Sequence, residues 1–424
     1  MLGRATTTGD NCGLKIVVDP NDINWPDITE VSVGNMSIYS LQRNDFAWSR
    51  WPQVAYTADL AQRTSDPMVG VHIVRYACGG ISVHTKIRHL VVDGNGAWRF
   101  YQAWAQLCQA ECKKSSKCMV FRPQDDEPQL LSRSAMFRTL AELPAPSQGM
   151  EDSNVVVAEH VSHISQYFDR VLERQLQSSN KNQAETYSYS VRKFTLTHEA
   201  GTRLKAKHGR LSMCSPEHMS FVGAHNIKYV STNDLICAVF WRAITRAHSA
   251  LNPSDPSTCM MMACDMRSRI GLPLTYTGNA SFPLIMNMDK SQMLRHTLTD
   301  TATWIRRQIN ILSPEYVRHM SAVMARPEDV QRLISIFHPS NSFFSASILS
   351  GFPMFDMVDF GFGKPVHIDV PPYLTPGFSI WMPTRPTAQS AKTPTIGIDI
   401  ALREDVYQLM LRDTEFSEHL EAMY

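Results

Sequence analysis

Alternating apolar and polar positions predict a β-hairpin in the first quarter of the chain. Residues 69–76 and 81–88 both alternate, and Cys78-Gly79-Gly80 stands between them. A period of two is typical of a half-buried strand, and paired glycines favour a tight turn. These residues are therefore expected to form a strand, a turn and a second strand.

A helical period follows from Gly96, with apolar residues three or four positions apart up to Cys108. A second helix is expected from about 154 to 176. Ser231 and Asp234 have the spacing of a helix cap, so a third helix is expected to begin there. Further strands are predicted at 187–196, 260–264, 343–349 and 396–402. Because no internal repeat is present, the pattern predicts a mixed α/β fold.

Two stretches without a regular apolar period separate these elements. Residues 121–150 hold several prolines and the cluster Asp125-Asp126-Glu127, which indicates an exposed connection. The polar residues 178–185 come before the strand expected at 187–196. The domain boundary is therefore expected near residue 185, giving domains 1–185 and 186–424.

Composition narrows the class of protein. The 424 residues are 43% hydrophobic and carry 41 basic and 40 acidic side chains. Because the two numbers are nearly equal, the chain has no long-range electrostatic field that would attract nucleic acid or a lipid surface. The nine cysteines lack a C-x-x-C pair, and no apolar run has the length of a secretory signal or a membrane span. We expect a cytoplasmic monomer with no bound metal.

The segment His89-Leu90-Val91-Val92-Asp93-Gly94 carries the first candidate for chemistry. If the strand continued, His89 would lie on the same side as Ile87 and point into an interior. A neutral imidazole, with an ordinary pKa near 6.5, can act as a general base near neutral pH. Asp93 could orient its surroundings, and Gly94 permits a sharp turn. A structural histidine at a strand end fits the same residues.

A second segment, Asp359-Phe360-Gly361-Phe362-Gly363, changes this interpretation. Taken alone it indicates a structural turn. H-x-x-x-D-G followed much later by D-F-G-F-G resembles the BAHD acyltransferase superfamily, and the chain is similar to its fungal trichothecene 3-O-acetyltransferase-like members. The resemblance extends over about residues 69–415. The other segments that carry it are Cys78-Gly79-Gly80, Ser231 to Asp234 with Phe240-Trp241-Arg242, Asp265 to Arg269, Gly278-Asn279-Ala280 and Pro383 to Pro386.

The resemblance implies two chloramphenicol-acetyltransferase-like α/β domains with mixed sheets and a tunnel between them. Acyl-CoA would enter from one face and the acceptor from the other. His89 would be the general base, and Asp93 would pair with Arg267 and hold the geometry of the motif. The loop with Asp359, Gly361 and Gly363 would be structural.

Several positions depart from the family pattern. Arg88 replaces the usual first histidine and is expected to face away from His89, and Phe362 replaces a tryptophan in a packed loop. Ile348-Leu349 stands where the family has Ser-Trp or Thr-Trp, so Ser345 or Ser347 is the candidate donor to the oxyanion. The motif histidine comes early in the chain, so the first domain is expected to be shortened at its start.

The co-substrate implied by the resemblance is acyl-CoA, with Ser231, Thr232 and Asn279 as candidate contacts. On charge alone, Lys228, Arg242, Arg246 and Arg269 are candidates for its phosphates. The predicted activity is transfer of an acyl group, expected to be acetyl, to a hydroxyl of a secondary metabolite without a covalent acyl-enzyme. The acceptor is a small alcohol or amine. The alternatives are condensation-domain-like amide or ester formation and a catalytically weak binding protein.

Overall fold

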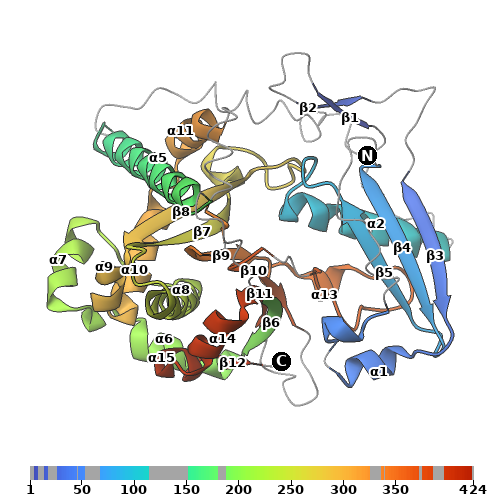
Figure 1. Cartoon of the computed structure of the whole chain (residues 1–424). Helices are drawn as coiled ribbons and strands as arrows, with labels where there is room; N and C mark the ends of the chain where they lie inside the picture. Colours follow the sequence, from blue (N-terminus) through green and yellow to red (C-terminus); the bar gives the residue numbers. More distant parts are fainter. Residues whose placement is uncertain are drawn as a thin grey trace. The chain divides into compact units, whose positions relative to one another are not determined.

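The computed structural model (Figure 1) describes residues 4–7, 14–17, 26–44, 46–52, 67–113, 151–179, 188–324, 336–338, 340–371, 375–384 and 396–422. Contacts divide the chain into two compact units. The first is Met1–Leu131 with Thr275–Asn279, and the second is Ser132–Leu274 with Ala280–Tyr424.

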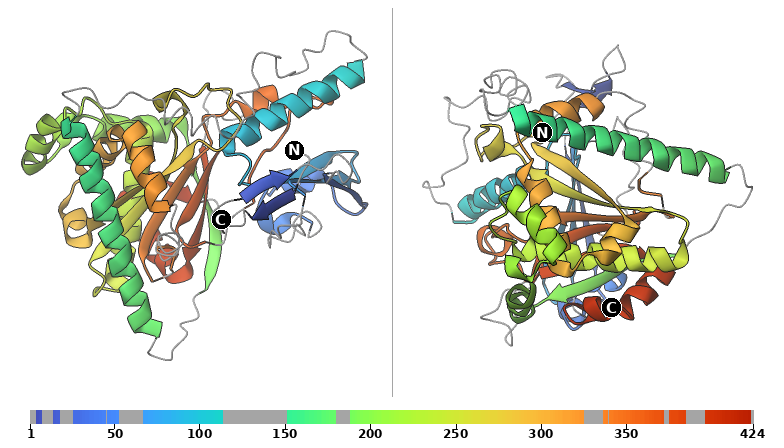
Figure 2. Two further views of the ribbon diagram at one scale, coloured as in Figure 1. Left: turned by 90° about the horizontal axis from the view of Figure 1, so that it is seen from above. Right: turned by 90° about the vertical axis from the view of Figure 1, so that its left-hand side faces the viewer.

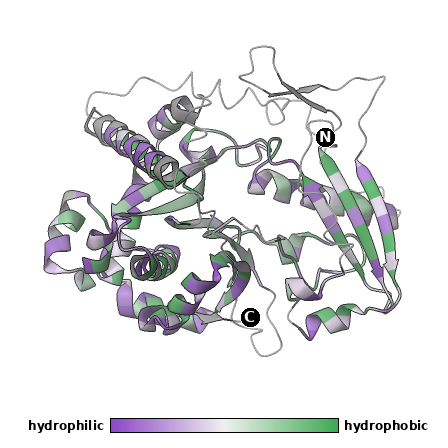
Figure 3. Cartoon of the chain, viewed as in Figure 1, coloured by the Kyte–Doolittle hydropathy of each residue, from purple (hydrophilic) through white to green (hydrophobic). Residues whose placement is uncertain are grey.

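The first unit contains a three-stranded sheet in the order β3-β4-β5. β3 (Asp27–Val33) runs parallel to β4 (Val69–Tyr76), and β5 (Ile81–Ile87) runs antiparallel to β4. Hydrophobic and hydrophilic bands alternate along β3 and β4 (Figure 3), as a period of two requires. The predicted hairpin is confirmed, and its second strand ends at Ile87.

Both faces of this sheet are covered. On one face, Val69 and Val71 join a buried cluster against which Phe100 and Trp104 of α2 (Gly94–Lys113) pack. On the other face, Val74 and Tyr76 pack with Leu41 and Phe46. The remaining elements of this unit are β1 (Arg4–Thr7), β2 (Leu14–Val17), α1 (Ile38–Gln42) and the 3-10 turn η1 (Trp48–Arg50). The helix predicted from Gly96 is confirmed as α2, which starts two residues earlier.

The second unit is built on a seven-stranded sheet in the order β12-β6-β11-β10-β9-β7-β8. β9 is parallel to both β7 and β10, and the other pairs are antiparallel, so the sheet is mixed. Its strands are β6 (Tyr189–Leu196), β7 (Ser257–Asp265), β8 (Ser281–Asp289), β9 (Ser342–Ile348), β10 (Phe378–Pro383), β11 (Ile396–Arg403) and β12 (Glu421–Ala422). The four strands predicted in this half are confirmed as β6, β7, β9 and β11.

Helices cover both faces of this sheet. The helices α5 (Glu151–Ser179) and α11 (Pro314–Met324) lie on one side and α8 (Thr232–Leu251) on the other (Figures 1 and 2). α8 is apolar on nearly all sides and almost entirely buried, as expected for a helix inside a core. Its Phe240 stacks on Phe344 of β9 with ring centroids 5.5 Å apart. The other helices are α6 (His198–His208), α7 (Pro216–Ala224), α9 (Lys290–Arg295), α10 (Leu298–Asn310), α13 (Met354–Met357), α14 (Glu404–Leu411) and α15 (Thr414–Ser417), with 3-10 turns η3 (Leu211–Met213) and η4 (Arg267–Arg269).

The division between the units differs from the boundary expected near residue 185. α2 belongs to the first unit, whereas α5 packs on α11 and β8 of the second. The division therefore comes before α5, although the pattern of α5 itself was predicted. The connection expected at 121–150 and the boundary residues 180–187 lie outside the described residues. No helix in the described part of the chain is both long enough and apolar enough to span a bilayer.

Candidate active site

The turn between β5 and α2 carries the H-x-x-x-D-G segment. The backbone N–H of Arg88 donates to Met68 O at 3.0 Å, and that of Val91 donates to Arg88 O at 3.0 Å, so the strand stops at Ile87. The Arg88 side chain is buried, whereas that of His89 is exposed. The two side chains thus differ in environment, but in the opposite sense to the one expected, with Arg88 buried and His89 exposed. The prediction that His89 continues the strand and points into an interior is wrong, because the alternation ends before it.

Asp93 is the N-cap residue of α2. Its side chain is buried, and Oδ1 accepts a hydrogen bond from Gly96 N at 2.9 Å. Its backbone carbonyl accepts the first helical bond from Ala97 N at 2.8 Å. Aspartate is among the best N-cap residues because it satisfies an amide that has no partner within the helix. Asp93, four residues after His89, therefore fixes the start of α2, whose first helical residue is Gly94.

A loop from much later in the chain lies against this turn. Asn279 Nδ2 donates to the backbone oxygen of His89 at 2.7 Å, across 190 residues of sequence. A Cβ on Gly96 would lie 2.2 Å from Thr277 O, so only glycine fits between the helix and the loop. Sequence reasoning linked Asn279 to CoA and missed this contact. The sequence signal at this position was the family-like pair Gly278-Asn279, which marked Asn279 as a candidate residue but did not indicate its partner.

Arg267 lies in η4 of the second unit, just after β7. Its side chain is fully buried, and Nη1 forms an ion pair with Asp265 Oδ1 at 3.0 Å. The backbone N–H of Arg267 donates to the same oxygen at 2.9 Å. Asp93 belongs to the first unit. The pairing of Asp93 with Arg267 stays a prediction.

The D-F-G-F-G segment is a tight turn organised by its aspartate. Asp359 Oδ1 accepts from Gly361 N at 2.8 Å and from Gly363 N at 3.0 Å. Both glycines have positive φ, 102° and 106°, which other residues rarely adopt. This geometry favours the structural role expected for Asp359, Gly361 and Gly363. Phe362 is 81% exposed, so the expectation of a packed ring at this position is wrong.

The candidate oxyanion donors lie on β9. Ser345 and Ser347 are two residues apart and therefore share a face of the sheet. Ser345 is buried, and its Oγ has no hydrogen-bond partner among the described residues, whereas Ser347 is partly exposed. A hydroxyl with an uncommitted hydrogen is what an oxyanion requires. The role of either serine stays a prediction.

Ser231 and Thr232 lie at the start of α8. Ser231 and Asp234 form the predicted capping box, with Asp234 N donating to Ser231 Oγ at 3.1 Å and Ser231 N to Asp234 Oδ2 at 2.6 Å. Arg306 donates to the same two oxygens, at 2.9 and 2.6 Å. The Ser231 hydroxyl is thus engaged in the cap, whereas Thr232 is the first residue of a 20-residue helix.

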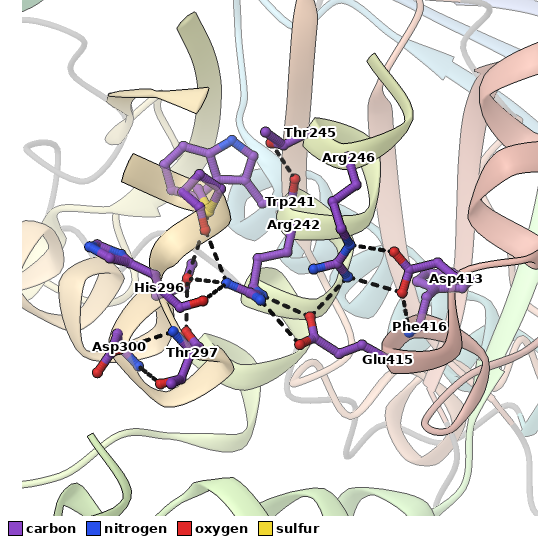
Figure 4. A network of polar contacts seen from close by, with 12 residues as sticks. Trp241, Arg242, Thr245, Arg246, His296, Thr297, Asp300, Asp413, Glu415 and Phe416 are labelled. Carbon is purple, nitrogen blue, oxygen red and sulfur yellow. Dashed lines mark hydrogen bonds and ion pairs between the residues drawn. The ribbon is translucent and has the colours of Figure 1, made fainter. Parts of the chain in front are cut away.

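Two of the basic residues suggested for the CoA phosphates are paired with carboxylates (Figure 4). Arg242, nearly buried, donates to Glu415 Oε1 at 2.7 Å and Oε2 at 3.2 Å. Arg246 donates to Asp413 Oδ1 at 3.0 Å and to Glu415 Oε1 at 2.9 Å. Burial alone would raise the pKa of Glu415, but the two arginines outweigh it and lower that pKa. Arg242 and Arg246 are therefore structural cations.

The other two basic candidates differ from each other. Lys228 is exposed, and Arg269 Nη1 donates to the backbone oxygen of Asp265 at 3.3 Å. Within the described stretches, no group of three His, Cys, Asp or Glu side chains is arranged to hold a metal ion. The arrangement that remains for chemistry is an exposed imidazole on a turn fixed by Asp93 and Asn279.

Curated proteins similar to this chain are acyltransferases by name. Hydroxycinnamoyl-CoA:piscidic acid hydroxycinnamoyltransferase of Actaea racemosa is 23% identical over 328 residues, which cover 75% of this chain and 64% of the relative. Trichothecene 3-O-acetyltransferase of Saccharomyces cerevisiae is 28% identical over 204 residues, which cover 45% of this chain and 40% of the relative. The matches thus span less than two thirds of each relative.

The fold is similar to that of a solved structure, F. sporotrichioides TRI101 complexed with coenzyme A and T-2. The TM-score is 0.68 at 18% identity, covering 100% of this chain and 87% of that chain. This similarity confirms the predicted two-domain α/β fold. The Transferase family model matches residues 34–403, which include both the H-x-x-x-D-G and the D-F-G-F-G segments. The chain therefore belongs to this Transferase family, the BAHD acyltransferases that its motifs resemble.

Proposed function

We propose that this protein is an acyl-CoA-dependent O-acyltransferase that transfers an acetyl group to a hydroxyl of a secondary metabolite. The observation that carries the proposal is the turn that presents His89. Its imidazole is exposed, while Asn279 holds its backbone and the capped start of α2 follows it. A reachable base on a fixed backbone is what proton removal from a bound alcohol requires.

His89 is the general base of the proposed reaction. Its imidazole takes the proton of the acceptor hydroxyl as the hydroxyl oxygen bonds to the thioester carbonyl carbon. The tetrahedral intermediate collapses, the carbon–sulfur bond breaks, and the imidazolium returns the proton to the CoA sulfur. No covalent acyl-enzyme is required, because a positioned base and two bound substrates suffice. Ser345 or Ser347 is the proposed donor to the oxyanion.

The proposed CoA contact in the second unit is the start of α8. The N-terminus of a long helix favours phosphate because its amides and its dipole attract negative charge. Thr232 begins this helix, and the exposed Lys228 is four residues before it. Support comes from the CoA complex of TRI101 and from the acyltransferase names of the relatives. We also propose a cytoplasmic monomer that needs no metal.

A thiol-release assay tests the function. The protein is incubated with acetyl-CoA or a hydroxycinnamoyl-CoA and a panel of terpenoid and alkaloid alcohols that includes T-2, and the acylated product is identified by mass. We expect CoA release that depends on an acceptor and is lost in His89→Ala. Release without an acylated product would indicate hydrolysis, and binding of an acceptor without turnover would favour the weak binding protein. Turnover only with a carrier-bound thioester would favour condensation chemistry.

A further inference from the structure

We propose that Asn279 is a positioning residue, which fixes the backbone of His89 so that its imidazole keeps one direction. The inference rests on the proposed function, because a direction matters only if His89 acts on a substrate. It also reassigns Asn279, which the sequence suggested as a contact for CoA. The argument depends on three observations within the first unit.

The first observation is the hydrogen bond itself. Asn279 Nδ2 lies 2.7 Å from the backbone oxygen of His89. A carbonyl oxygen can only accept, so the amide nitrogen must face His89. Asn279 Oδ1 is consequently turned away and is buried with no hydrogen-bond partner in the described part of the chain. One of the two hydrogens of the amide nitrogen, which a CoA phosphate would need as donor, is therefore already committed to His89.

The second observation is that the loop carrying Asn279 has little freedom to move. Thr277 O is so close to Gly96 that any Cβ there would lie 2.2 Å away. Gly278 is pressed against the buried Tyr276, since its Cβ would lie 2.2 Å from the Tyr276 hydroxyl oxygen. Real Cβ atoms do not approach heavy atoms so closely, so a side chain at Gly96 would displace the Thr277 backbone and one at Gly278 would displace the ring of Tyr276. The donor is thus held by a rigid loop.

The third observation is where the bond acts. The turn has backbone bonds at Arg88 and at Val91, and the Asp93 cap follows. The bond from Asn279 holds the peptide between His89 and Leu90, which lies between these points. Rotation of that peptide would redirect the His89 side chain, because the direction of Cβ follows the backbone. A misplacement of about 1 Å can cost about 100-fold in rate.

The test compares Asn279→Ala with a matched control, Asn44→Ala. Asn44 Nδ2 also donates to a backbone oxygen at 2.7 Å, that of Ser40, in the same unit. We expect Asn279→Ala to lower kcat about 10- to 100-fold with KM for acetyl-CoA changed less than twofold. We also expect faster hydrogen exchange in the peptide that covers residues 88–93. Asn44→Ala should change neither kcat nor the hydrogen exchange of this peptide. Asn279→Asp, which keeps the size of the side chain, serves if the alanine variant folds poorly.

Each contrary result has a distinct meaning. A raised KM for acetyl-CoA with an unchanged kcat would make Asn279 a CoA contact and overturn the proposal. Faster exchange with an unchanged kcat would make the bond merely structural. Unchanged hydrogen exchange of residues 88–93 in Asn279→Ala would show that Asn279 does not hold the turn, regardless of the activity of the variant. A wild type that transfers no acyl group to any acceptor would overturn the proposed function, and the exchange measurement would still decide whether Asn279 anchors His89.

Discussion

Lys193 of β6 and Asp399 of β11 are direct cross-strand partners, with Nζ 3.4 Å from Asp399 Oδ2. Asp369, which follows the D-F-G-F-G segment, approaches the same ammonium, with Nζ 2.7 Å from Asp369 Oδ2. All three side chains are nearly inaccessible to solvent. One buried cation therefore faces two buried carboxyl groups, and both can ionise only at a large electrostatic cost.

This arrangement predicts a pH-dependent stability that depends on Asp399. Burial, and then the charge of Asp369, raise the pKa of Asp399 from 3.8 to about 7. For Asp369, burial opposes ionisation, but His367 and Lys193 outweigh it and lower its pKa. Between about pH 4 and 7 the folded state keeps a proton on Asp399 that the unfolded chain has lost. The contribution of Asp399 to folding stability therefore falls as the pH rises through this window.

Asp399→Asn should remove that part of the pH dependence. We expect the variant to gain stability over the wild type from pH 5 to pH 8, by at most about 4 kcal/mol, since a pKa difference of one is worth about 1.4 kcal/mol. Lys193 keeps Asp369 as its partner in the variant. Urea unfolding of both proteins at several pH values measures the difference. If the free energy of unfolding of the two proteins changed with pH in parallel, Asp399 would not titrate in this range.

His89→Ala is expected to abolish transfer while leaving CoA affinity unchanged, because the base acts on the proton of the acceptor. Loss of a general base costs about 10² to 10⁴ in rate. Since the His89 side chain is exposed, the melting temperature should stay within about 1 °C of the wild type. His163→Ala, which removes an exposed histidine of α5, is the matched control. A His89→Ala variant with more than half of the wild-type kcat would reduce His89 to a structural residue.

The sequence predicted elements whose pattern is local. The hairpin at 69–87 and the capping box at Ser231 follow from periods and spacings within a few residues. β8 was missed, because its apolar run carries Pro283 and lacks alternation. The strand ending at Ile87 was extended by one residue, since a turn that begins inside an alternating run leaves no mark in the pattern.

Contacts between distant segments could not be predicted from local patterns. Arg242 seemed available to phosphate on charge alone, because its partner Glu415 lies 173 residues later. The contact of Asn279 with His89 spans 190 residues, and the Gly278-Asn279 pair, although family-like, does not indicate which residue Asn279 contacts. The motif residues could thus be identified from the sequence, whereas the residues that hold them in place could be identified only from the structure.

CoA alone is expected to stabilise the protein. A ligand at a hundred times its dissociation constant adds about 2.7 kcal/mol to the free energy of unfolding, which for a chain of this size corresponds to a few degrees in Tm. Differential scanning fluorimetry with millimolar CoA measures the shift, and desulfo-CoA or adenosine identifies the part of CoA that is bound. The shift should persist in His89→Ala. A Tm that does not move at millimolar CoA would contradict the CoA site.

The proposed pairing of Asp93 with Arg267 predicts that substitutions of the two residues have coupled effects on the free energy of unfolding. Both side chains are buried, and a guanidinium forms strong hydrogen bonds with a carboxylate. Asp93→Asn is the informative change, because asparagine caps a helix as well as aspartate and only the charge is lost. Arg267→Met removes the cation, and Asp265, which is partly exposed, can then turn to water. Removing one member of a buried pair costs about 3 to 5 kcal/mol.

A double-mutant cycle measures this coupling. The variant with both Asp93→Asn and Arg267→Met should recover part of the loss caused by either change, because no unpaired buried charge remains. Asp93→Ala should lose about 1 kcal/mol more than Asp93→Asn, since it also removes the cap of α2. An interaction energy within about 0.5 kcal/mol of zero would refute the pairing. If Asp93→Asn instead kept full stability and lost only activity, Asp93 would orient His89 in the manner of a catalytic triad.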